Sequence, residues 1–304
     1  SYQHAKYGVA VSNGTVALEV ALGAAGIKAG DEVLMPAYTF MATPAAALEV
    51  NALPVFVDID PSTYNLDARG VEKSITDKTK AIMPVHIGGC PADMDNILKI
   101  ARGNGLKVIE DACQAWGAEW RSKRVGALGD LGAFSFQSSK NITCGEGGIV
   151  IANDRELYEL GWSYHNCGRN MGGAWYQHDV LGFNFRMTEF QAAILLVQLT
   201  RLDEQTRTRN ENSLYLSQEL AKIKGIEPLK RSPEITSHSY HLYIFKYDKE
   251  EFEGLPRGKF IEALRAEGIP CSSGYVPLYK ELFMLNLAQD SLLHRLYGEK
   301  IDYS

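Results

Sequence analysis

Short apolar runs alternate with helical patterns along the first half of the chain. The predicted strands and helices are, in order, 32–36, 41–50, 53–57, 67–75, 80–85, 94–103 and 106–110. Strands separated by helices are joined by crossover connections, and these build a mostly parallel sheet with helices packed on it. Ligands of such sheets bind beyond the carboxyl ends of the strands. The alternation therefore predicts an α/β domain and the edge at which its site lies.

The composition excludes several classes of protein. The chain has 304 residues, 45% of them hydrophobic and 22% charged, with a net charge of −6. This length suits one large domain and a smaller one, and the mild acidity argues against nucleic acid or an anionic membrane as the main partner. No apolar run approaches the ~20 residues of a membrane span, and the first residues lack a signal-peptide pattern. Five scattered cysteines without a CxxC pair argue against a disulfide framework or a metal site, and we expect a cytoplasmic protein.

Lys140 lies in an unusual setting, the stretch Gly132–Val150. Two apolar, strand-like runs flank a polar, glycine-rich loop that carries the lysine beside buried sheet. A lysine there loses its proton more easily than a solvated one, and a neutral amine is what Schiff-base chemistry requires. Taken alone, the residue is better explained as a surface lysine on a hairpin loop. Its neighbours in the fold decide between the two.

Gly14 and Thr15 follow a short apolar strand and open a helical segment. The first N–H groups of a helix have no intrahelical partner, so a helix start is a ready site for a phosphate. An ordinary N-cap explains these residues about equally well.

Three further residues follow predicted strands. Phe40 comes after strand 32–36 and could stack on a flat ligand ring, although an aromatic there is usually part of the core. Asp111, after strand 106–110, could serve a positively charged ring nitrogen or simply cap a turn. His86, after strand 80–85, could face the same crevice, but a lone histidine is more often structural.

The second half of the chain has a different pattern of apolar and charged residues. A long helical pattern runs from Thr188 to about Ile223, first apolar and then charged, as in a connector between domains or a dimer surface. Beyond it we expect strands at 239–247 and 269–273 with a helix at 258–267. We therefore predict a large domain over 1–222 that ends in a long connecting helix, and a smaller α+β domain over 223–304.

A phosphate site, a stacking aromatic, an acid and a Schiff-base lysine together are what pyridoxal 5′-phosphate requires. The chain resembles the DegT/DnrJ/EryC1/StrS sugar aminotransferases, which are fold-type I (aspartate-aminotransferase-like) enzymes. The stretches that match in family order cover most of residues 8–200: VSNGTVALEVAL, DEVLMPAYTFMAT, TYNLD, MPVHIGGCPADMD, VIEDACQAWGA, FSFQSSKNITCGEGGIV and LGFNFRMTEFQAAILLVQL.

The resemblance implies roles around the cofactor ring. Lys140 would form the internal aldimine and shuttle the substrate proton. Asp111 would pair with the pyridine nitrogen, Gln114 would lie beside the phenolic oxygen, and Phe40 would stack on the ring.

The resemblance also implies which residues contact the phosphate and the substrate. Gly14, Thr15 and Ser135 would hold the phosphate, together with Asn184 from the neighbouring chain of a homodimer. His86 and Tyr275 are candidates for substrate contact. No metal is implied.

The implied reaction moves an amino group from L-glutamate or L-glutamine to a ketone. The ketone would belong to a keto-sugar, often nucleotide-linked, or to a keto-cyclitol, in amino-sugar, polysaccharide or antibiotic biosynthesis. Family members usually extend well before the position of Ser1 and beyond Ser304, so we expect the N-terminal arm to be missing and the small domain to be truncated.

Other functions remain open at this point. An aminohydroxybenzoate-synthase-like enzyme would share most of these motifs. A sugar dehydratase of the same family typically has histidine in place of the lysine, so Lys140 argues against it. A catalytically silent cofactor-binding homologue is a third possibility. A nucleotide-binding module is disfavoured because neither GxGxxG nor GxxxxGK[ST] occurs.

Overall fold

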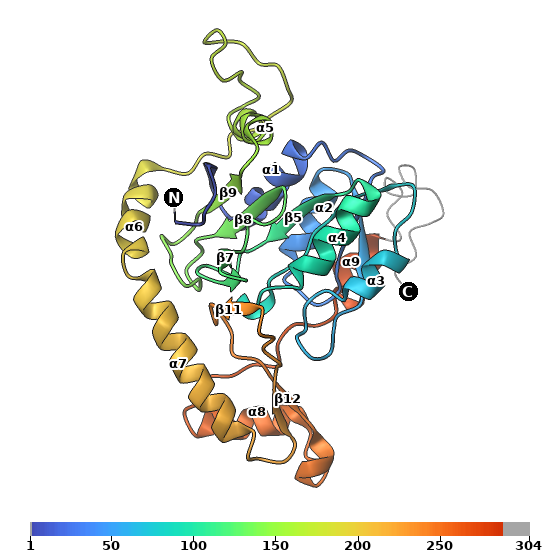
Figure 1. Ribbon diagram of the computed structural model, residues 1–304, viewed down its shortest axis with the longest axis vertical. Coiled ribbons are helices and arrows are strands. Elements are labelled where there is room, and N and C mark those ends of the chain that lie inside the picture. Colours follow the sequence, from blue (N-terminus) through green and yellow to red (C-terminus); the bar gives the residue numbers. More distant parts are fainter. Residues whose placement is uncertain (1, 288–304) are drawn as a thin grey trace.

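A seven-stranded mixed sheet forms the centre of the molecule (Figure 1). The computed structural model describes residues 2–287, and the sheet order is β1-β9-β8-β5-β4-β2-β3. Its strands are β1 (Tyr7–Val11), β2 (Glu32–Pro36), β3 (Leu53–Val57), β4 (Thr79–Ile82), β5 (Lys107–Asp111), β8 (Leu131–Ser135) and β9 (Gly148–Ala152). The predicted α/β fold with a mostly parallel sheet is confirmed.

The direction of the strands brings several candidate residues to one edge. The pairs β3–β2, β2–β4, β4–β5 and β5–β8 are parallel, whereas β9 runs antiparallel to both β8 and β1. Because β1 therefore runs in the same direction as β8, it ends at the same edge as the parallel strands. Asp111 and Ser135 are the last residues of their strands there, and the chain leaves β1 at that edge to enter the next helix.

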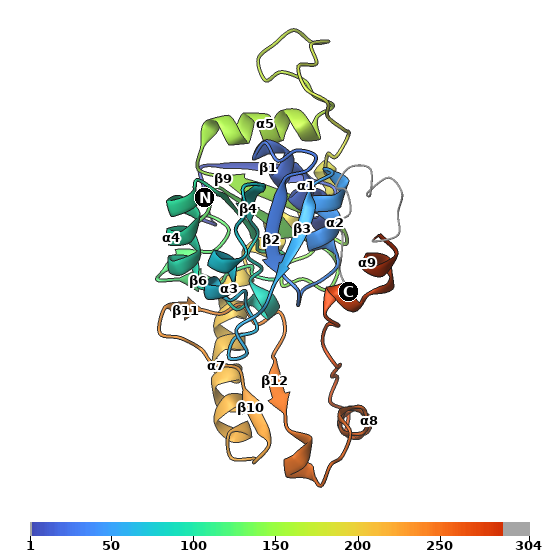
Figure 2. The ribbon, with the colours of Figure 1, turned by 90° about the vertical axis from the view of Figure 1, so that its right-hand side faces the viewer.

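Helices cover both faces of the sheet. Figure 2 shows α1 and α2 on one side and α3 and α4 on the other. The helices are α1 (Gly14–Ala24), α2 (Ala42–Glu49), α3 (Ala68–Lys73), α4 (Met94–Asn104), α5 (Arg155–His165), α6 (Glu189–Leu199), α7 (Leu202–Leu220), α8 (Arg257–Ala266) and α9 (Leu282–Leu287), with 3₁₀ turns η1 (Ile87–Gly89), η2 (Lys249–Phe252) and η3 (Leu278–Lys280). No helix within residues 2–287 is long and apolar enough to cross a membrane.

Two apolar cores lie on opposite faces of the sheet. Val108 belongs to the core under α4 and Ile109 to the core under α1 and α2, because successive side chains of a strand point to opposite faces. The same alternation separates the next two residues. Glu110 faces the α4 side, and Asp111 faces the α2 side.

Glu110 is a buried carboxylate that organises the loop after the β6–β7 hairpin (Glu119–Trp120 and Lys123–Arg124). It accepts hydrogen bonds from the backbone N–H groups of Gly126, Leu128 and Gly129 at 2.6–2.8 Å and pairs with His86 Nε2 at 3.0 Å. Each bond satisfies a donor that would otherwise be buried without a partner.

We expect the Glu110→Ala variant to lose about 3–5 kcal/mol of unfolding free energy, because its removal leaves several buried donors unpaired. Urea denaturation followed by circular dichroism measures this loss. Glu72→Ala, an exposed change on α3, is the control and should stay within about 0.5 kcal/mol. An equal stability for the two variants would contradict this role of Glu110.

The long helix expected from Thr188 to Ile223 is two helices, α6 and α7, so that expectation was wrong. The N–H groups of Thr200 and Arg201 bond to carbonyl groups three residues back, at Val197 and Gln198. The Thr200 hydroxyl also donates to the Val197 carbonyl at 2.8 Å. These bonds tighten the backbone into a 3₁₀ turn, which separates the two helices.

Helix α7 runs away from the sheet, and the chain beyond it first turns back toward the sheet at β11 (Figure 1). There β10 (Ile226–Pro228) pairs with β12 (Phe245–Tyr247), whereas β11 (Ile235–Ser237) pairs with β6 of the first part. The predicted helix at 258–267 is confirmed as α8. The domain boundary at 222/223 stays a prediction, and residues 288–304 of the predicted small domain lie outside the described residues.

Two predicted strands differ from the structure. Only Phe245–Tyr247 of the range 239–247 forms a strand, because Tyr240 has a positive φ of 44° and the Ser239 side chain bonds to the carbonyl group of Gln114. The range 269–273 has irregular backbone and pairs with no strand of the described chain.

Candidate active site

The loop that carries Lys140 joins β8 to β9 at the carboxyl edge of the sheet. The Lys140 N–H donates to the Gln137 carbonyl at 2.9 Å, and the Gln137 side chain accepts from the N–H and hydroxyl of Ser139. Further along, the Phe136 carbonyl accepts from the Thr143 hydroxyl at 2.9 Å. Local hydrogen bonds thus fix a half-buried lysine on a short, ordered turn.

Asp111 is buried at the end of β5 with both oxygens engaged. The Thr43 hydroxyl of α2 donates to Oδ2 at 2.8 Å, and the Cys113 N–H donates to Oδ1 at 3.2 Å. Thr43 in turn contacts the Thr39 hydroxyl at 3.1 Å. A carboxylate that accepts these bonds is oriented and keeps lone pairs for a further donor.

The charges of Asp111 and Lys140 both influence the pKa of the Cys113 thiol. Burial raises its pKa well above the ordinary value, the Asp111 carboxylate adds to the rise, and Lys140 opposes it. Both charges therefore lie within electrostatic range of one thiol at the sheet edge. The roles expected of these two residues, an acid and a Schiff-base lysine, stay predictions.

The start of α1 lies directly against the end of β8. Asn13 caps the helix by accepting from the Val16 N–H at 2.9 Å, and the N–H groups of Gly14 and Thr15 have no intrahelical partner. A Cβ atom at Gly14 would lie 2.7 Å from Ser135 Cβ, so the absence of a side chain brings helix and strand together. The helix start and the Ser135 hydroxyl form a cradle that fits a phosphate group.

We expect Gly14→Ala to weaken cofactor binding about ten- to a hundredfold, because overpacking costs about 1–3 kcal/mol. A titration with pyridoxal phosphate, followed by absorbance, measures the dissociation constant. The control is Gly103→Ala on α4, where an added Cβ meets no atom within 4 Å. Equal affinity of both variants would show that the cradle tolerates a side chain and does not touch the ligand.

Phe40, Gln114 and Tyr275 lie around this edge. Phe40 is 54% exposed just before α2, so its ring is free to contact a ligand. The Gln114 Oε1 accepts from the Gly88 N–H at 2.8 Å, and its Nε2 donates to the Tyr275 hydroxyl at 3.1 Å. Burial raises the pKa of Tyr275, and the Asp111 charge contributes to the rise. Residues far apart in the sequence therefore meet here.

His86 has a different environment from the one expected of a substrate residue. It is fully buried on the α4 side, with Nε2 bound to Glu110 and Nδ1 accepting from the Ala92 N–H at 3.0 Å. Both ring nitrogens are engaged inside the core, and this favours a structural role. Asn184 is exposed, on a segment whose neighbours bond to the end of β1 and the end of α5.

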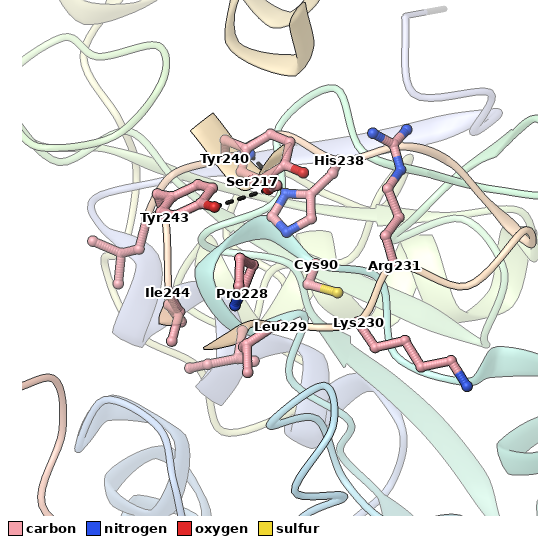
Figure 3. Close-up of a pocket in the computed structure, with 12 residues that line it drawn as sticks. Cys90, Ser217, Pro228, Leu229, Lys230, Arg231, His238, Tyr240, Tyr243 and Ile244 are labelled. Atoms are coloured by element: carbon pink, nitrogen blue, oxygen red, sulfur yellow. Dashed lines mark hydrogen bonds between the residues drawn. The ribbon is translucent and has the colours of Figure 1, made fainter. Parts of the chain in front are cut away.

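A small pocket in the described part of the chain is lined by none of the site residues named above. This pocket, of about 30 Å³, is lined by residues that include His238, Tyr240, Ser217 and Tyr243 (Figure 3). The His238 and Tyr240 rings stack at 3.7 Å, and the Ser217 and Tyr243 hydroxyls lie 2.8 Å apart. This volume holds on the order of one or two water molecules and no substrate. Within residues 2–287 no cluster of three or more His, Cys, Asp or Glu side chains could hold a metal ion.

Several side chains at the site were not predicted from the sequence. Thr43 orients Asp111, and Asn141 donates from the Lys140 loop to the Ser239 carbonyl at 2.7 Å. Thr43 is a polar residue in an alanine-rich helix, and this contrast is a usable signal. Asn141 gives no such signal, because its partner lies 98 residues away.

At this sheet edge a lysine and a carboxylate both act on one thiol. A helix start that contains a glycine forms a cradle beside them. This is the architecture of the fold-type I pyridoxal-phosphate transferases. Comparison with known proteins identifies a family within this class. A model of the DegT/DnrJ/EryC1/StrS aminotransferase family matches residues 1–292, and the chain belongs to this family.

Named relatives and a solved structure support the assignment. The chain is 40% identical over 289 residues to an L-glutamine:2-deoxy-scyllo-inosose aminotransferase of Streptoalloteichus tenebrarius, covering 92% of this chain and 68% of that protein. It is 41% identical to GDP-perosamine synthase of Caulobacter vibrioides, covering 96% and 78%. The crystal structure of 3-amino-5-hydroxybenzoic acid synthase superposes with a TM-score of 0.89 at 37% identity, covering 100% and 80%. The chain is therefore an aminotransferase of the pyridoxal-phosphate-dependent type.

Proposed function

We propose that this chain binds pyridoxal 5′-phosphate and transfers the amino group of L-glutamine, or of L-glutamate, to a ketone of a cyclitol or sugar. The observation that carries the proposal is the shared neighbourhood of Lys140, Cys113 and Asp111 at a sheet edge that also offers a phosphate cradle. Membership of an aminotransferase family supports it independently.

Different residues would bind different parts of the cofactor. Gly14, Thr15 and Ser135 would bind its phosphate through N–H and hydroxyl donors, and Phe40 would cover one face of its ring. Asp111, oriented by Thr43, would accept a hydrogen bond from the ring nitrogen and keep that nitrogen protonated.

Lys140 would have two roles. Its Nζ would hold the cofactor through the cofactor's aldehyde carbon, with loss of water, until the amine of the donor displaces it. The freed amine would take the proton from the donor α-carbon and return a proton to the acceptor. Bound pyridoxal phosphate supplies an electron sink that stores the amino group between the two half-reactions. The polar but ordered loop of Lys140 would keep the amine within reach of both substrates.

The nature of the ketone is the least constrained part of the proposal. The names of the relatives favour two acceptors, a keto-cyclitol and a nucleotide-linked keto-sugar, in antibiotic, amino-sugar or polysaccharide biosynthesis. We place the keto-cyclitol first, because several relatives are named for cyclitol substrates, at 39–41% identity over 91–98% of the chain.

A two-stage assay tests the function. The holoenzyme is first mixed with L-glutamine or L-glutamate, and conversion to the amine form of the cofactor is followed by visible absorbance. The amine form is then offered 2-deoxy-scyllo-inosose and a nucleotide-linked keto-sugar, and return of the original spectrum identifies the acceptor. No change with either amino donor would support the silent homologue instead. A dehydratase would release water from a sugar without consuming a donor.

A second candidate function is the synthesis of an aminohydroxybenzoate. The similarity to the solved 3-amino-5-hydroxybenzoic acid synthase favours it, with the chain covered in full. Release of an aromatic product with strong ultraviolet absorbance from a cyclic ketone precursor would distinguish this activity from amino transfer to a cyclitol.

We also propose that the protein acts as a homodimer in the cytoplasm. Helix α6 exposes Phe190 (85%) and Leu196 (70%), an apolar surface that a second copy would cover, and Asn184 just before it is exposed and free to reach a neighbouring phosphate. Five free cysteines suit a reducing compartment. Sedimentation of the holoenzyme decides the oligomeric state, and full cofactor retention by a monomer would exclude the shared site.

A further inference from the structure

His241 lies within electrostatic range of two cations, Lys140 and Arg209. Burial lowers the pKa of His241 to about 4, and the positive charges of Lys140 and of Arg209 on α7 contribute to that decrease. Both cations therefore lie within electrostatic range of one half-buried imidazole. The three residues come from the β8–β9 loop, from α7 and from the segment that follows β11.

Hydrogen bonds hold these three segments together. Asn141, next to Lys140, donates to the Ser239 carbonyl at 2.7 Å. Asn210, next to Arg209, donates to the His238 carbonyl at 2.6 Å and accepts from the His238 N–H at 3.3 Å. The backbone at 238–239 is thus bonded on both sides, and this fixes the relative positions of Lys140, Arg209 and His241.

Arg209 is the member of the group that has an unsatisfied donor in the described part of the chain. Its Nη1 is buried and has no hydrogen-bond partner within residues 2–287, and burial is the sole cause that lowers its pKa. A nearby carboxylate would have raised that pKa. Arg207, two residues earlier on α7, is by contrast exposed and lies 4.0 Å from Glu211. A buried guanidinium donor without an acceptor, beside a second cation, favours an anion.

We propose that Arg209, together with Lys140 and His241, forms the subsite that binds the α-carboxylate of the amino-acid donor. The inference rests on the proposed function. In an amino acid the carboxylate is attached to the carbon that bears the reacting amine, so it must lie next to Lys140 when that amine reacts. The diphosphate of a nucleotide-linked acceptor is several bonds away from its ketone and would lie farther out. The guanidinium offers two parallel N–H groups to a carboxylate, and the neutral imidazole offers one more donor.

The test pairs a change in the protein with a change in the donor. Arg209→Gln is compared with Arg207→Gln as the matched control, and L-glutamine is compared with L-glutamine α-amide, which lacks the carboxylate. We expect Arg209→Gln to raise KM for L-glutamine about ten- to a hundredfold, as for loss of a charge-assisted hydrogen bond. KM for the α-amide and for the ketone should stay the same, and the control should behave like the wild type. Equal effects on both donors, or an effect on the acceptor alone, would overturn the proposal.

A binding measurement separates this inference from the proposed function. Maleate carries carboxylates but no amine, so it can occupy the subsite without reacting. It should raise the Tm of the holoenzyme for the wild type and Arg207→Gln, but not for Arg209→Gln. The same shift in all three proteins would overturn the subsite even if none transfers an amine. Arg209→Lys, which keeps the charge, should restore part of the shift, whereas no restoration by a folded Arg209→Lys would speak against an anion subsite.

Discussion

Lys140→Ala is expected to lower the rate of amino transfer by about 10³–10⁶, the range seen when a covalent nucleophile is removed. The variant loses both the amine that would bond to the cofactor and the base that would move the donor proton. The fold should persist, because the local bonds of the loop come from the backbone of Lys140 and from the Gln137 and Thr143 side chains. Single-turnover absorbance with L-glutamine measures the rate.

Two comparisons support the interpretation of that result. Lys140→Arg keeps the positive charge but cannot bond to the cofactor carbonyl carbon, so it should be as inactive as Lys140→Ala. Ser139→Ala changes a neighbouring hydroxyl that bonds within the loop and should retain most of the activity. Activity within tenfold of the wild type in Lys140→Ala would remove the lysine from the chemistry.

Asp111→Asn is expected to lower the first half-reaction with L-glutamine by about 10²–10³, as for removal of one oriented electrostatic partner. Asparagine has the same shape but no charge, so the ring nitrogen of the cofactor would lose the group that keeps it protonated. Stopped-flow absorbance gives the rate, and a thermal melt reports stability in the same samples.

Thr43→Val is a milder change that affects the same carboxylate. It removes the hydroxyl that donates to Asp111 Oδ2 at 2.8 Å but leaves the carboxylate in place. We expect a loss of about tenfold, because the acid is still present but less well oriented. A Thr43→Val loss as large as that of Asp111→Asn would mean that the hydroxyl, and not the charge, is what the cofactor requires.

Much of the fold could be predicted from the sequence because its signals are local. The strands 32–36 and 53–57 match β2 and β3 to the residue, and the cap residue Asn13 marks the start of α1. The sheet edge that gathers Gly14, Asp111, Ser135 and Lys140 follows from the crossover pattern. These residues are short-range features of strand ends and helix starts.

The remainder depends on contacts between distant segments. The sequence shows His86 after a strand but not that Glu110 and the Ala92 N–H occupy both of its ring nitrogens. It shows a continuous helical pattern across Thr200, where local 3₁₀ bonds divide the helix.

The grouping of Arg209 and His241 also depends on contacts between distant segments. No periodicity in the sequence indicates this group of residues, because its members come from a loop, a helix and an irregular segment. These segments are brought together by hydrogen bonds to the backbone. Long-range hydrogen bonds of this kind have no signature in a single sequence, so the donor subsite could be found only from the structure.

The most direct measurement for the central claim is covalent trapping at Lys140. Holoenzyme treated with borohydride and digested with protease should yield one modified peptide, containing Lys140 and carrying the mass of a reduced pyridoxyl phosphate group. Lys140→Ala treated in the same way should yield none. A modified peptide that contains a different lysine, or an unmodified wild-type protein that still binds the cofactor, would contradict the claim that this amine carries it.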